Sequence, residues 1–292
     1  MSTFMQLTIN GAGSGAVFAL LALGFVIIYR ASGAVNFAHG SLVLVAGYIT
    51  VRAQESMGIT VAAILGVLGA GVLAVIIERV LVARTRGGDP IALVLLTIGV
   101  DVVIVEEVAR RLGSSAPFVR VPWANEVIHV GQITVLKGQI VALCFGLVII
   151  AVLFALFRFT GWGLAMRAQA EHREAAALMG VRNTQVTAAA WLIAGVLAGI
   201  AVLFLATPDF AGGGVSRATH SLVLVAFPAA IIGGLDSTNG AVIGGFIVGL
   251  TGAYSQQYVS FEFARVAVYL VMLAVLVVRP SGLFGTKEVQ RV

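Results

Sequence analysis

The residues best suited to binding chemistry are concentrated in one polar interval between two long apolar runs. This interval, Gly161–Arg182, reads GWGLAMRAQAEHREAAALMGVR and carries Arg167, Glu171, Arg173 and Glu174 in a chain of which only 11% is charged. Because charged side chains are costly to transfer into hydrocarbon, the interval is expected to lie in water. Its acids and bases are suited to ion pairing with a partner molecule.

Apolar residues of the same interval recur near helical spacing at Leu164, Ala168, Ala175 and Leu178, while the charged residues fall on another face. This pattern predicts a short amphipathic helix that ends at Gly180, because glycine is favoured just beyond a helix C-terminus. Apolar runs on both sides would hold the helix at a membrane surface. The interval is therefore predicted to be a docking surface.

The second half of the interval spells EAA followed by a glycine six positions after the glutamate. This resembles the EAA loop of ATP-binding-cassette importer permeases, a short cytoplasmic helix that docks into a groove of the ATPase subunit. The resemblance implies a coupling role for Arg167, Glu171, Arg173, Glu174, Ala175, Ala176 and Gly180. The alternative is an ordinary solvated loop helix, since EAA is common in alanine-rich chains, and no isoleucine, leucine and proline follow Arg182 as in the classical pattern.

Composition shows where such a helix must sit. The chain has 292 residues, of which 60% are hydrophobic and 35 are glycine, and a mean hydropathy of +1.05. This is more apolar surface than a soluble core can bury, so we expect an all-α polytopic membrane protein. The net charge of +5 belongs mainly to loops, where lysine and arginine orient spans, and does not indicate nucleic-acid binding. With one cysteine, there is neither an intrachain disulfide nor a thiolate metal cluster.

Apolar runs of suitable length predict eight or nine membrane spans within a single permease domain, residues 1–292. The runs, some of them short or broken, cover residues 10–29, 37–51, 59–82, 91–109, 139–159, 187–206, 221–232, 241–256 and 264–278. The longest interval between them, 110–138, contains alternating and turn-like pieces. It is predicted to be an extramembrane loop that could include a β-hairpin.

The distribution of positive charge orients these spans. With residues 161–182 in the cytoplasm, eleven of the 18 lysines and arginines lie inside and seven lie outside. This agrees with the positive-inside rule and predicts an N-out, C-in topology with the 110–138 loop extracytoplasmic. Nine crossings satisfy this topology, whereas eight, with one short run only dipping into the membrane, would move one terminus to the other side.

Polar residues within the spans are candidates for a translocation path. Asn36 and His39 open the short second span, where they either line the path or cap a helix at an interface. Metal binding is not expected there, because no carboxylate or cysteine lies nearby in the sequence. Asp101 lies in the middle of a span, where an acid costs about 2.5–3.5 kcal/mol on insertion scales. It either lines the route or pairs with Arg79 or with another subunit.

A late glycine-rich segment supplies two further path candidates, Gly233 and Gly234. Small residues four apart recur just after them, at 240 and 244 and at 241 and 245. Such spacing allows two helices to approach closely, so helix packing is the alternative to substrate contact. The hexapeptide SLVLVA also occurs twice, at 41–46 and 221–226, each time after a histidine; this is either chance or a trace of two related halves.

Three longer stretches resemble the permease family for branched-chain amino acids, in the family's order. They are Gly11–Tyr48, which contains VNFAHG, then Phe227–Gly245 (FPAAIIGGLDSTNGAVIGG), and RPSGLFG at Arg279–Gly285. The resemblance implies a subunit in the plasma (inner) membrane of a prokaryote that pairs with a second, related permease. It also implies two cytoplasmic ATPase subunits, an extracytoplasmic substrate-binding protein and import of branched-chain or related small amino acids by alternating access.

Motifs that the chain lacks limit the alternatives. Its only lysines, Lys137 and Lys287, are followed by glycine and glutamate, so no phosphate-binding P-loop is present and ATP is expected to bind to partner subunits. HExxH and GxSxG are also absent, and we expect neither an enzyme nor a resident cofactor. The rival interpretation is an ion-coupled secondary transporter or a channel, which Asp101 and the broken helices would also suit. Urea and short amides remain open as substrates.

Overall fold

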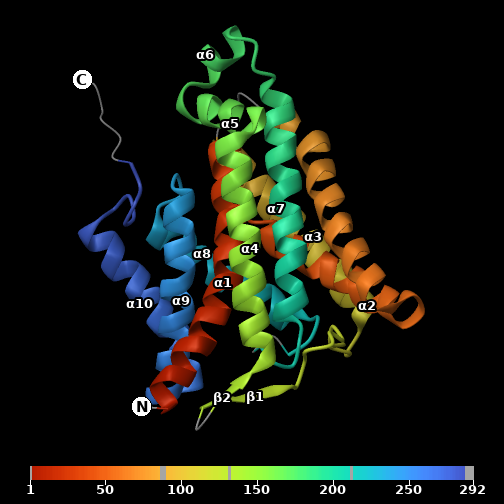
Figure 1. Ribbon diagram of the computed structural model, residues 1–292. Coiled ribbons are helices and arrows are strands. Elements are labelled where there is room, and N and C mark those ends of the chain that lie inside the picture. The colour runs from red at the N-terminus through yellow and green to blue at the C-terminus, as the bar shows by residue number, and fades with distance from the viewer. Residues whose placement is uncertain (1, 86–89, 131–132, 211–212, 287–292) are drawn as a thin grey trace.

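The computed structural model describes residues 2–85, 90–130, 133–210 and 213–286, which form a helical bundle with one small β-hairpin (Figure 1). The elements in chain order are α1 (Ser2–Ser32), α2 (His39–Val80), the 3-10 turn η1 (Val82–Thr85), α3 (Pro90–Leu112), β1 (Val127–Val130), β2 (Ile133–Leu136), α4 (Lys137–Phe159), α5 (Gly161–Glu171), α6 (Arg173–Leu178), α7 (Asn183–Leu205), α8 (Arg217–Gly233), α9 (Thr238–Tyr258) and α10 (Phe261–Val278).

Five stretches of the described chain are long and apolar enough to cross a membrane: α1, α2 with η1, α4, α7 and α10. The apolar helix α8 is shorter, at 17 residues. Large apolar side chains are exposed along α2, α3, α4 and α10, which suits helices that face lipid or another subunit. The prediction of an all-α polytopic membrane protein is confirmed, and each predicted apolar run lies in a helix of its own or in one arm of α2.

Helix α2 consists of two arms rather than one rod. Gly58 has φ 74° and ψ 162°, a conformation that only glycine adopts without strain, and the chain reverses there (Figure 1). The arms pack closely: a Cβ at Gly66 would lie 2.1 Å from Thr50 Oγ1. That hydroxyl donates to the Ala46 carbonyl of its own arm at 2.8 Å and lies 3.5 Å from the Ala62 carbonyl of the other arm. The two predicted runs 37–51 and 59–82 are these two arms.

Helix α9 is the packing centre for α1 and α8. A Cβ at Gly245 would lie 2.5 Å from backbone atoms of Ala19 on α1, and one at Gly244 would lie 2.0 Å from the carbonyl oxygen of Ala229 on α8. The small residues four apart therefore allow two neighbouring helices, α1 and α8, to pack closely against α9. Because backbones approach this closely only where side chains are absent, the spacing reflects helix packing.

The interval 161–182 forms two helices, so the prediction of one continuous helix was wrong. The break is at His172, which is extended with φ −147° and ψ 96° between α5 and α6. The Asn183 side chain donates to the carbonyl of Arg173 at 3.0 Å and fixes the start of the second helix. Gly180, with φ 88°, follows the end of α6, as expected for a glycine beyond a helix C-terminus.

The bundle has two distinct ends. α5 and α6 lie at one end, and the N-terminus of α1 and the β1–β2 hairpin lie at the other (Figure 1). The hairpin pairs antiparallel, with Val127 opposite Leu136. The Glu126 carboxylate lies 2.5 Å from the Lys137 ammonium at its base. The predicted loop 110–138 thus contains the hairpin that its alternating sequence suggested.

Candidate functional site

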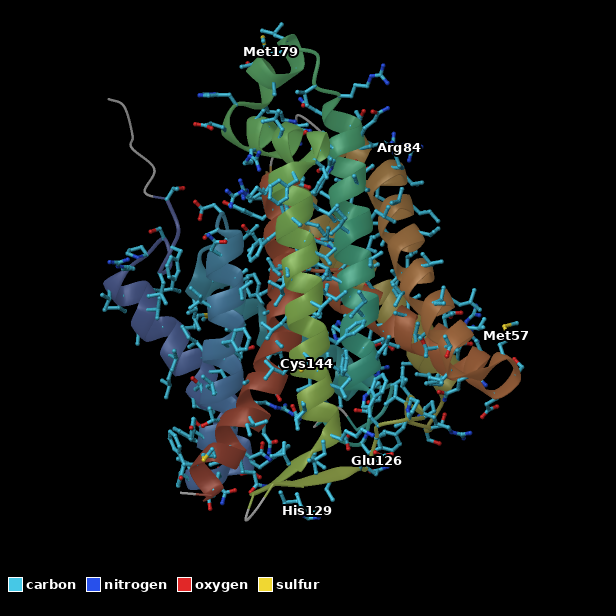
Figure 2. The ribbon with its side chains drawn as sticks, in the orientation of Figure 1. Met57, Arg84, Glu126, His129, Cys144 and Met179 are labelled. Atoms are coloured by element: carbon cyan, nitrogen blue, oxygen red, sulfur yellow. The ribbon has the colours of Figure 1, made fainter. Side chains whose placement is uncertain are left out.

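The surface formed by α5, α6 and the turn that follows them, here called the α5–α6 surface, exposes apolar side chains at its tip. Leu178 is 89% exposed and Met179 is 86% exposed. Figure 2 shows Met179 at the extreme end of the bundle, pointing away from the other helices. Apolar side chains in this position gain nothing from their own protein, so they are available to a partner.

Charged residues surround that tip. Arg167, Glu171, Arg173 and Glu174 are all exposed, and the Arg167 guanidinium donates to the carbonyl of Phe157. Within the described residues the other three side chains form no ion pair or hydrogen bond. Four of the predicted coupling residues thus lie together at one end of the molecule, and within the described residues the charges of Glu171, Arg173 and Glu174 are unpaired.

Some of the small residues of the EAA motif face the protein interior and others face the surface. Ala176 is buried, whereas Ala175 and Gly180 are exposed. An open groove of about 600 Å³ lies beside Gly180 and Met179 and is bounded by Trp162 and by the first turn of α7. The α5–α6 surface therefore combines an apolar tip, free charges and a groove.

The α5–α6 surface is joined to the membrane helices by buried polar contacts. The Gln169 amide donates to the Ala31 carbonyl at the end of α1 (2.9 Å) and to Thr187 Oγ1 on α7 (3.1 Å). The Trp162 indole donates to the Val186 carbonyl at 3.4 Å. Because the two Gln169 bonds are buried, moving α5 without moving α1 and α7 would leave polar groups unpaired.

Inside the bundle, three residues form what we call the Asp101 cluster: Asp101 on α3, Ser41 on α2 and His220 on α8. The Ser41 backbone N–H donates to Asp101 Oδ1 at 3.1 Å, and His220 Nε2 lies 2.9 Å from Asp101 Oδ2. An acid is favourable at this place because the first turn of α2 presents unpaired N–H groups and a positive dipole end. The predicted pairing partner Arg79 instead lies 3.6 Å from Glu78.

Helix α3 also holds the segment that precedes α2. Thr97, one helical turn before Asp101, accepts a hydrogen bond from the Phe37 N–H at 3.2 Å. Asn36 is fully buried, and its side-chain oxygen accepts from the Ala38 N–H at 3.0 Å. Asn36 thus acts as a local cap for the chain that enters α2.

His39 is fully buried, and neither ring nitrogen is hydrogen-bonded within the described residues. Its ring packs 4.7 Å from that of Phe25, and a Cβ at Gly24 would lie 2.4 Å from its Cε1. Gly24 thus provides the space that the imidazole occupies. A buried imidazole without a partner is unusual and keeps His39 a candidate for the path.

The remaining path candidates, Gly233 and Gly234, lie at the end of α8 against other backbone. A Cβ at Gly233 would lie 2.1 Å from the Gly240 carbonyl oxygen, and one at Gly234 would lie 2.6 Å from the Gly285 nitrogen. The space beside both glycines is therefore filled by their own chain. The five path candidates do not form one site, since Asn36, His39 and Asp101 surround the start of α2 and the glycines lie elsewhere.

At the opposite end of the bundle, the surface carries paired charges and an ordered loop. Arg217 makes a bidentate pair with Glu106, at 2.6 and 2.7 Å. Gln54 of α2 holds the loop after α3, because its side chain donates to the Phe118 carbonyl and accepts from the Arg120 N–H, both at 3.0 Å. These cross-helix pairs could not be predicted from the sequence, which does not say which helices are neighbours.

Comparisons with known proteins are consistent with this architecture. The solved structure titled "PsaBC from Streptococcus pneumoniae in complex with Fab" has a chain that matches 93% of this one over 91% of its own length, with a TM-score of 0.53 and 11% identity. At that identity the likeness concerns the fold alone.

Sequence relatives cover almost the whole chain. The branched-chain amino acid transport system permease protein LivH of Escherichia coli K12 is 30% identical over 99% of this chain and 98% of its own length. BraD of Pseudomonas aeruginosa, also named a branched-chain amino acid transport permease, is 26% identical over the same shares. A probable LivH of the archaeon Methanocaldococcus jannaschii is 28% identical over 91% and 88%.

Residues 7–277 match the family model described as the branched-chain amino acid transport system / permease component. Members of this family are transport subunits of the inner membrane rather than enzymes. The match includes the α5–α6 surface, the Asp101 cluster and the glycine packing around α9. The chain therefore belongs to the branched-chain amino acid transport permease family.

Proposed function

We propose that this chain is the membrane-spanning permease subunit of a prokaryotic ATP-binding-cassette importer for branched-chain or related small amino acids. The observation that carries the proposal is the α5–α6 surface, in a chain that has no P-loop. Leu178 and Met179 are exposed there, and Glu171, Arg173 and Glu174 have no ion pair within the described residues. Energy for uphill transport must then enter from a separate ATPase. The α5–α6 surface suits that contact.

The proposed orientation is N-out and C-in, with α5 and α6 in the cytoplasm and the 110–138 loop outside. Two cytoplasmic ATPase subunits would bind the α5–α6 surfaces of this chain and of a second, homologous permease. An extracytoplasmic substrate-binding protein would dock at the opposite end, which carries the hairpin and the Glu106–Arg217 pair. The excess of positive charge near the α5–α6 end supports this orientation.

Alternating access follows from how α5 is held. When the ATPases close, they displace α5 and α6, and the Gln169 bonds to Ala31 and Thr187 transmit the movement to α1 and α7. A shift of these helices against α8 and α9 would open the path to the other side. Asn36, His39, Asp101, Gly233 and Gly234 are proposed to lie along or beside that path, with the two glycines contributing mainly through close packing.

Charge reversal at the α5–α6 surface tests the proposal. The double variant Arg173→Glu with Glu174→Arg, reconstituted with its ATPases and binding protein, is expected to lose ATP-driven leucine uptake while it inserts and purifies like the wild type. A matched control is Arg173→Lys with Glu174→Asp, which keeps both charges at the same positions and is expected to retain most of the uptake. Full uptake in the double variant would contradict the proposed coupling role.

The second candidate is an ion-coupled secondary transporter or channel. The Asp101–His220 pair favours it, because intramembrane acid–histidine pairs occur in proton relays. The discriminating measurement is leucine uptake by this chain alone in liposomes under an imposed proton or sodium gradient. Uptake without ATPase subunits would support the second candidate and exclude the first.

A further inference from the structure

The hexapeptide SLVLVA, which occurs twice in the sequence, lies near the start of a helix both times, first in α2 and then in α8. Just before the first copy, the Asn36 side chain accepts a hydrogen bond from the Ala38 N–H at 3.0 Å. Just before the second copy, the Ser216 hydroxyl accepts one from the Ala218 N–H at 3.2 Å. Both caps precede their hexapeptide by the same number of positions, so the sequence and the local structure repeat together.

The helices before and after these two also correspond. α1 precedes α2 and packs against α9, whereas α7 precedes α8 and packs against the second arm of α2. A Cβ at Gly245 would lie 2.5 Å from the backbone of Ala19, and one at Gly199 would lie 2.6 Å from the Cα of Val67. Gly199 follows Ala19 by the interval that separates the two copies of SLVLVA. One turn away, two further close contacts correspond in the same way, Gly15–Gly249 and Gly195–Gly71.

The correspondence extends to α3 and α10 through the segments that follow them. The loop after α3 binds the turn between the two arms of α2, because Gln54 bonds to the Phe118 carbonyl and to the Arg120 N–H. The segment after α10 binds the turn between α8 and α9, where the Asp236 carboxylate accepts from the Thr286 N–H at 2.8 Å. In each half, the chain after the last helix therefore holds the turn between the two helices that precede it.

The two halves run in opposite directions. The end of α1 lies beside the start of α7, since the Trp191 indole donates to the Ser32 hydroxyl at 3.2 Å and the Thr187 hydroxyl lies 3.4 Å from the Ala31 carbonyl. The chain thus contains two inverted repeats, α1–α3 and α7–α10, in which the two arms of α2 correspond to α8 and α9. Transporters built from inverted repeats open to either side by moving one repeat against the other.

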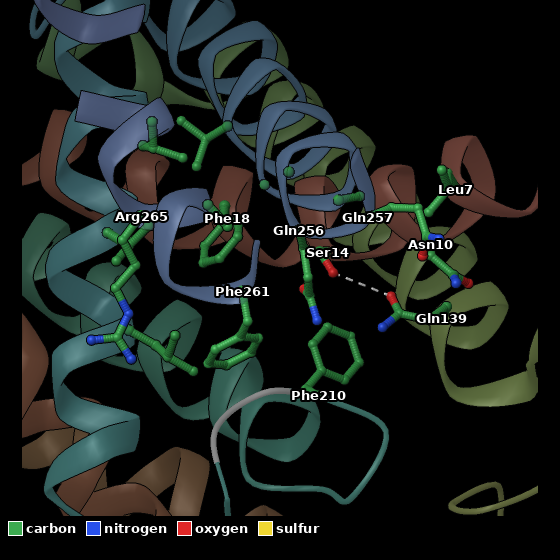
Figure 3. A pocket seen from close by; sticks show the side chains of 18 of the residues that line it. Leu7, Asn10, Ser14, Phe18, Gln139, Phe210, Gln256, Gln257, Phe261 and Arg265 are labelled. Carbon is green, nitrogen blue, oxygen red and sulfur yellow. Dashed lines mark hydrogen bonds between the residues drawn. The ribbon is translucent and has the colours of Figure 1, made fainter. Parts of the chain in front are cut away.

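The two repeats are not packed alike in this structure. A cavity of about 490 Å³ lies beside α1, α9 and α10, at the end of the bundle away from α5 and α6 (Figure 3). Ser14 and Phe18 of α1 line it and are partly exposed. Their counterparts on α7, at the interval between the SLVLVA copies, are Ala194 and Ala198, and both are fully buried. The place equivalent to the cavity is closed by the packing of α7.

We infer that this protein has a second state, in which an equivalent cavity opens toward the α5–α6 end between α7, the second arm of α2 and α3, while the present cavity closes. The inference rests on the proposed transport function and gives that function an exit on the cytoplasmic side. Exchanging the conformations of the two repeats produces this state without any new kind of contact.

The interface that must open is suited to separation. On the α2 side it consists of small residues, among them Ala70, Gly71 and Ala74, which pack against Gly195 of α7. Small side chains bury few apolar atoms, so exposing them to water costs less than exposing leucine or phenylalanine. The Gln169 amide also joins α5 to Thr187 near the start of α7. A partner that displaces α5 therefore acts directly on the helix that has to move.

The reactivity of single cysteines toward a charged methanethiosulfonate reagent tests the inference. The complete transporter is purified in nanodiscs with Cys144 replaced by serine, and modification of this chain is measured by mass spectrometry. Ser14→Cys probes the present cavity and Ala194→Cys its counterpart. Ala201→Cys is the matched control, because Ala201 is equally buried on α7 and its counterpart Leu21 does not line the cavity. Rates are compared without nucleotide and after trapping with ATP and vanadate.

Trapping is expected to change the rates at positions 14 and 194 in opposite directions. Each change should be about tenfold or more, because a buried thiol reacts only through the state that exposes it. Position 201 should stay unreactive in both conditions. Ala190→Cys is a second probe and should follow position 194, since its counterpart Asn10 also lines the present cavity.

Unchanged rates at positions 190 and 194 would overturn the inference, as would changes in the same direction as at position 14. Leucine uptake by the wild type, measured in liposomes with the binding protein added, separates this result from the proposed function. ATP-driven uptake with unchanged rates removes the second cavity and leaves the proposed function standing. Opposite changes that follow an imposed ion gradient in this chain alone, without ATP-driven uptake, remove the proposed function and leave the two alternating cavities standing.

Discussion

The α5–α6 surface and the Asp101 cluster are two polar regions of this apolar chain, and they differ in whether their partners lie within the protein. Asp101 is bonded to Ser41 and His220 of the same chain. The tip residues Leu178 and Met179 are more than four-fifths exposed, and in the part of the chain that the structure describes Glu171, Arg173 and Glu174 form no ion pair. A polar region whose groups are hydrogen-bonded within the chain stabilises the fold, whereas a region whose charged groups have no partner in the chain is suited to binding another molecule.

This contrast predicts that substitutions in the interior prevent folding, whereas substitutions at the tip abolish only the coupling of transport to the ATPase. The largest effect is expected at Gly245 of α9, where a Cβ would lie 2.5 Å from the backbone of α1. Gly245→Val should leave no monodisperse protein in size-exclusion chromatography, because overpacking against backbone costs more than about 3 kcal/mol here. Gly252 of the same helix has no atom within 4 Å of its Cβ position, so Gly252→Val is the matched control. Equal yields of the two variants would contradict the packing argument.

The next effect concerns the tip. Leu178→Asp with Met179→Asp should lower ATP-driven leucine uptake at least tenfold, since charged side chains cannot fill an apolar pocket on an ATPase. Thermal stability should stay near that of the wild type, because both side chains are solvent-exposed in the chain alone. The matched control is Leu178→Met with Met179→Leu, which keeps both exposed side chains apolar and should retain uptake. Figure 2 shows that the tip is free of other helices. If the double variant loses thermal stability together with uptake, then the tip stabilises the fold and the contrast between the two regions is wrong.

Much of the fold could be predicted from the sequence, because apolar runs of span length leave few alternatives in a membrane protein. The EAA interval could be located because its charges contrast with the flanking runs. The break at His172 could not be predicted, since the helical spacing of the apolar residues continues across it and only the backbone shows His172 extended. Local spacing does not report such a change of backbone conformation.

The Asp101 cluster was harder to predict from the sequence. Asp101 could be identified because an acid within a span is rare, but its partner His220 lies 119 positions away. Pairing across helices requires knowledge of which helices are neighbours.

A smaller effect is expected in the Asp101 cluster. Asp101→Ala should lower the free energy of unfolding by about 1–3 kcal/mol, because the Ser41 N–H and the His220 imidazole lose their acceptor. His220→Ala alone should cost less, and the double variant should cost less than the sum of the two. The measurement is a double-mutant cycle on purified protein. If Asp101→Asn abolishes uptake at wild-type stability, then Asp101 acts in the path and the contrast between the two regions fails.

The smallest effect is expected for the Glu106–Arg217 pair, which is bidentate but whose side chains are more than half exposed. Exposed ion pairs contribute about 0–1 kcal/mol, because water and salt screen the attraction and both long side chains lose freedom. Arg217→Gln should therefore change the stability of the isolated chain by less than about 1 kcal/mol, with a cycle against Glu106→Gln giving the coupling energy. Raising the salt concentration should reduce that coupling further. A coupling above about 2 kcal/mol that persists at high salt would show that lipid covers the pair. This end of the bundle, like the α5–α6 surface, would then be completed by another molecule.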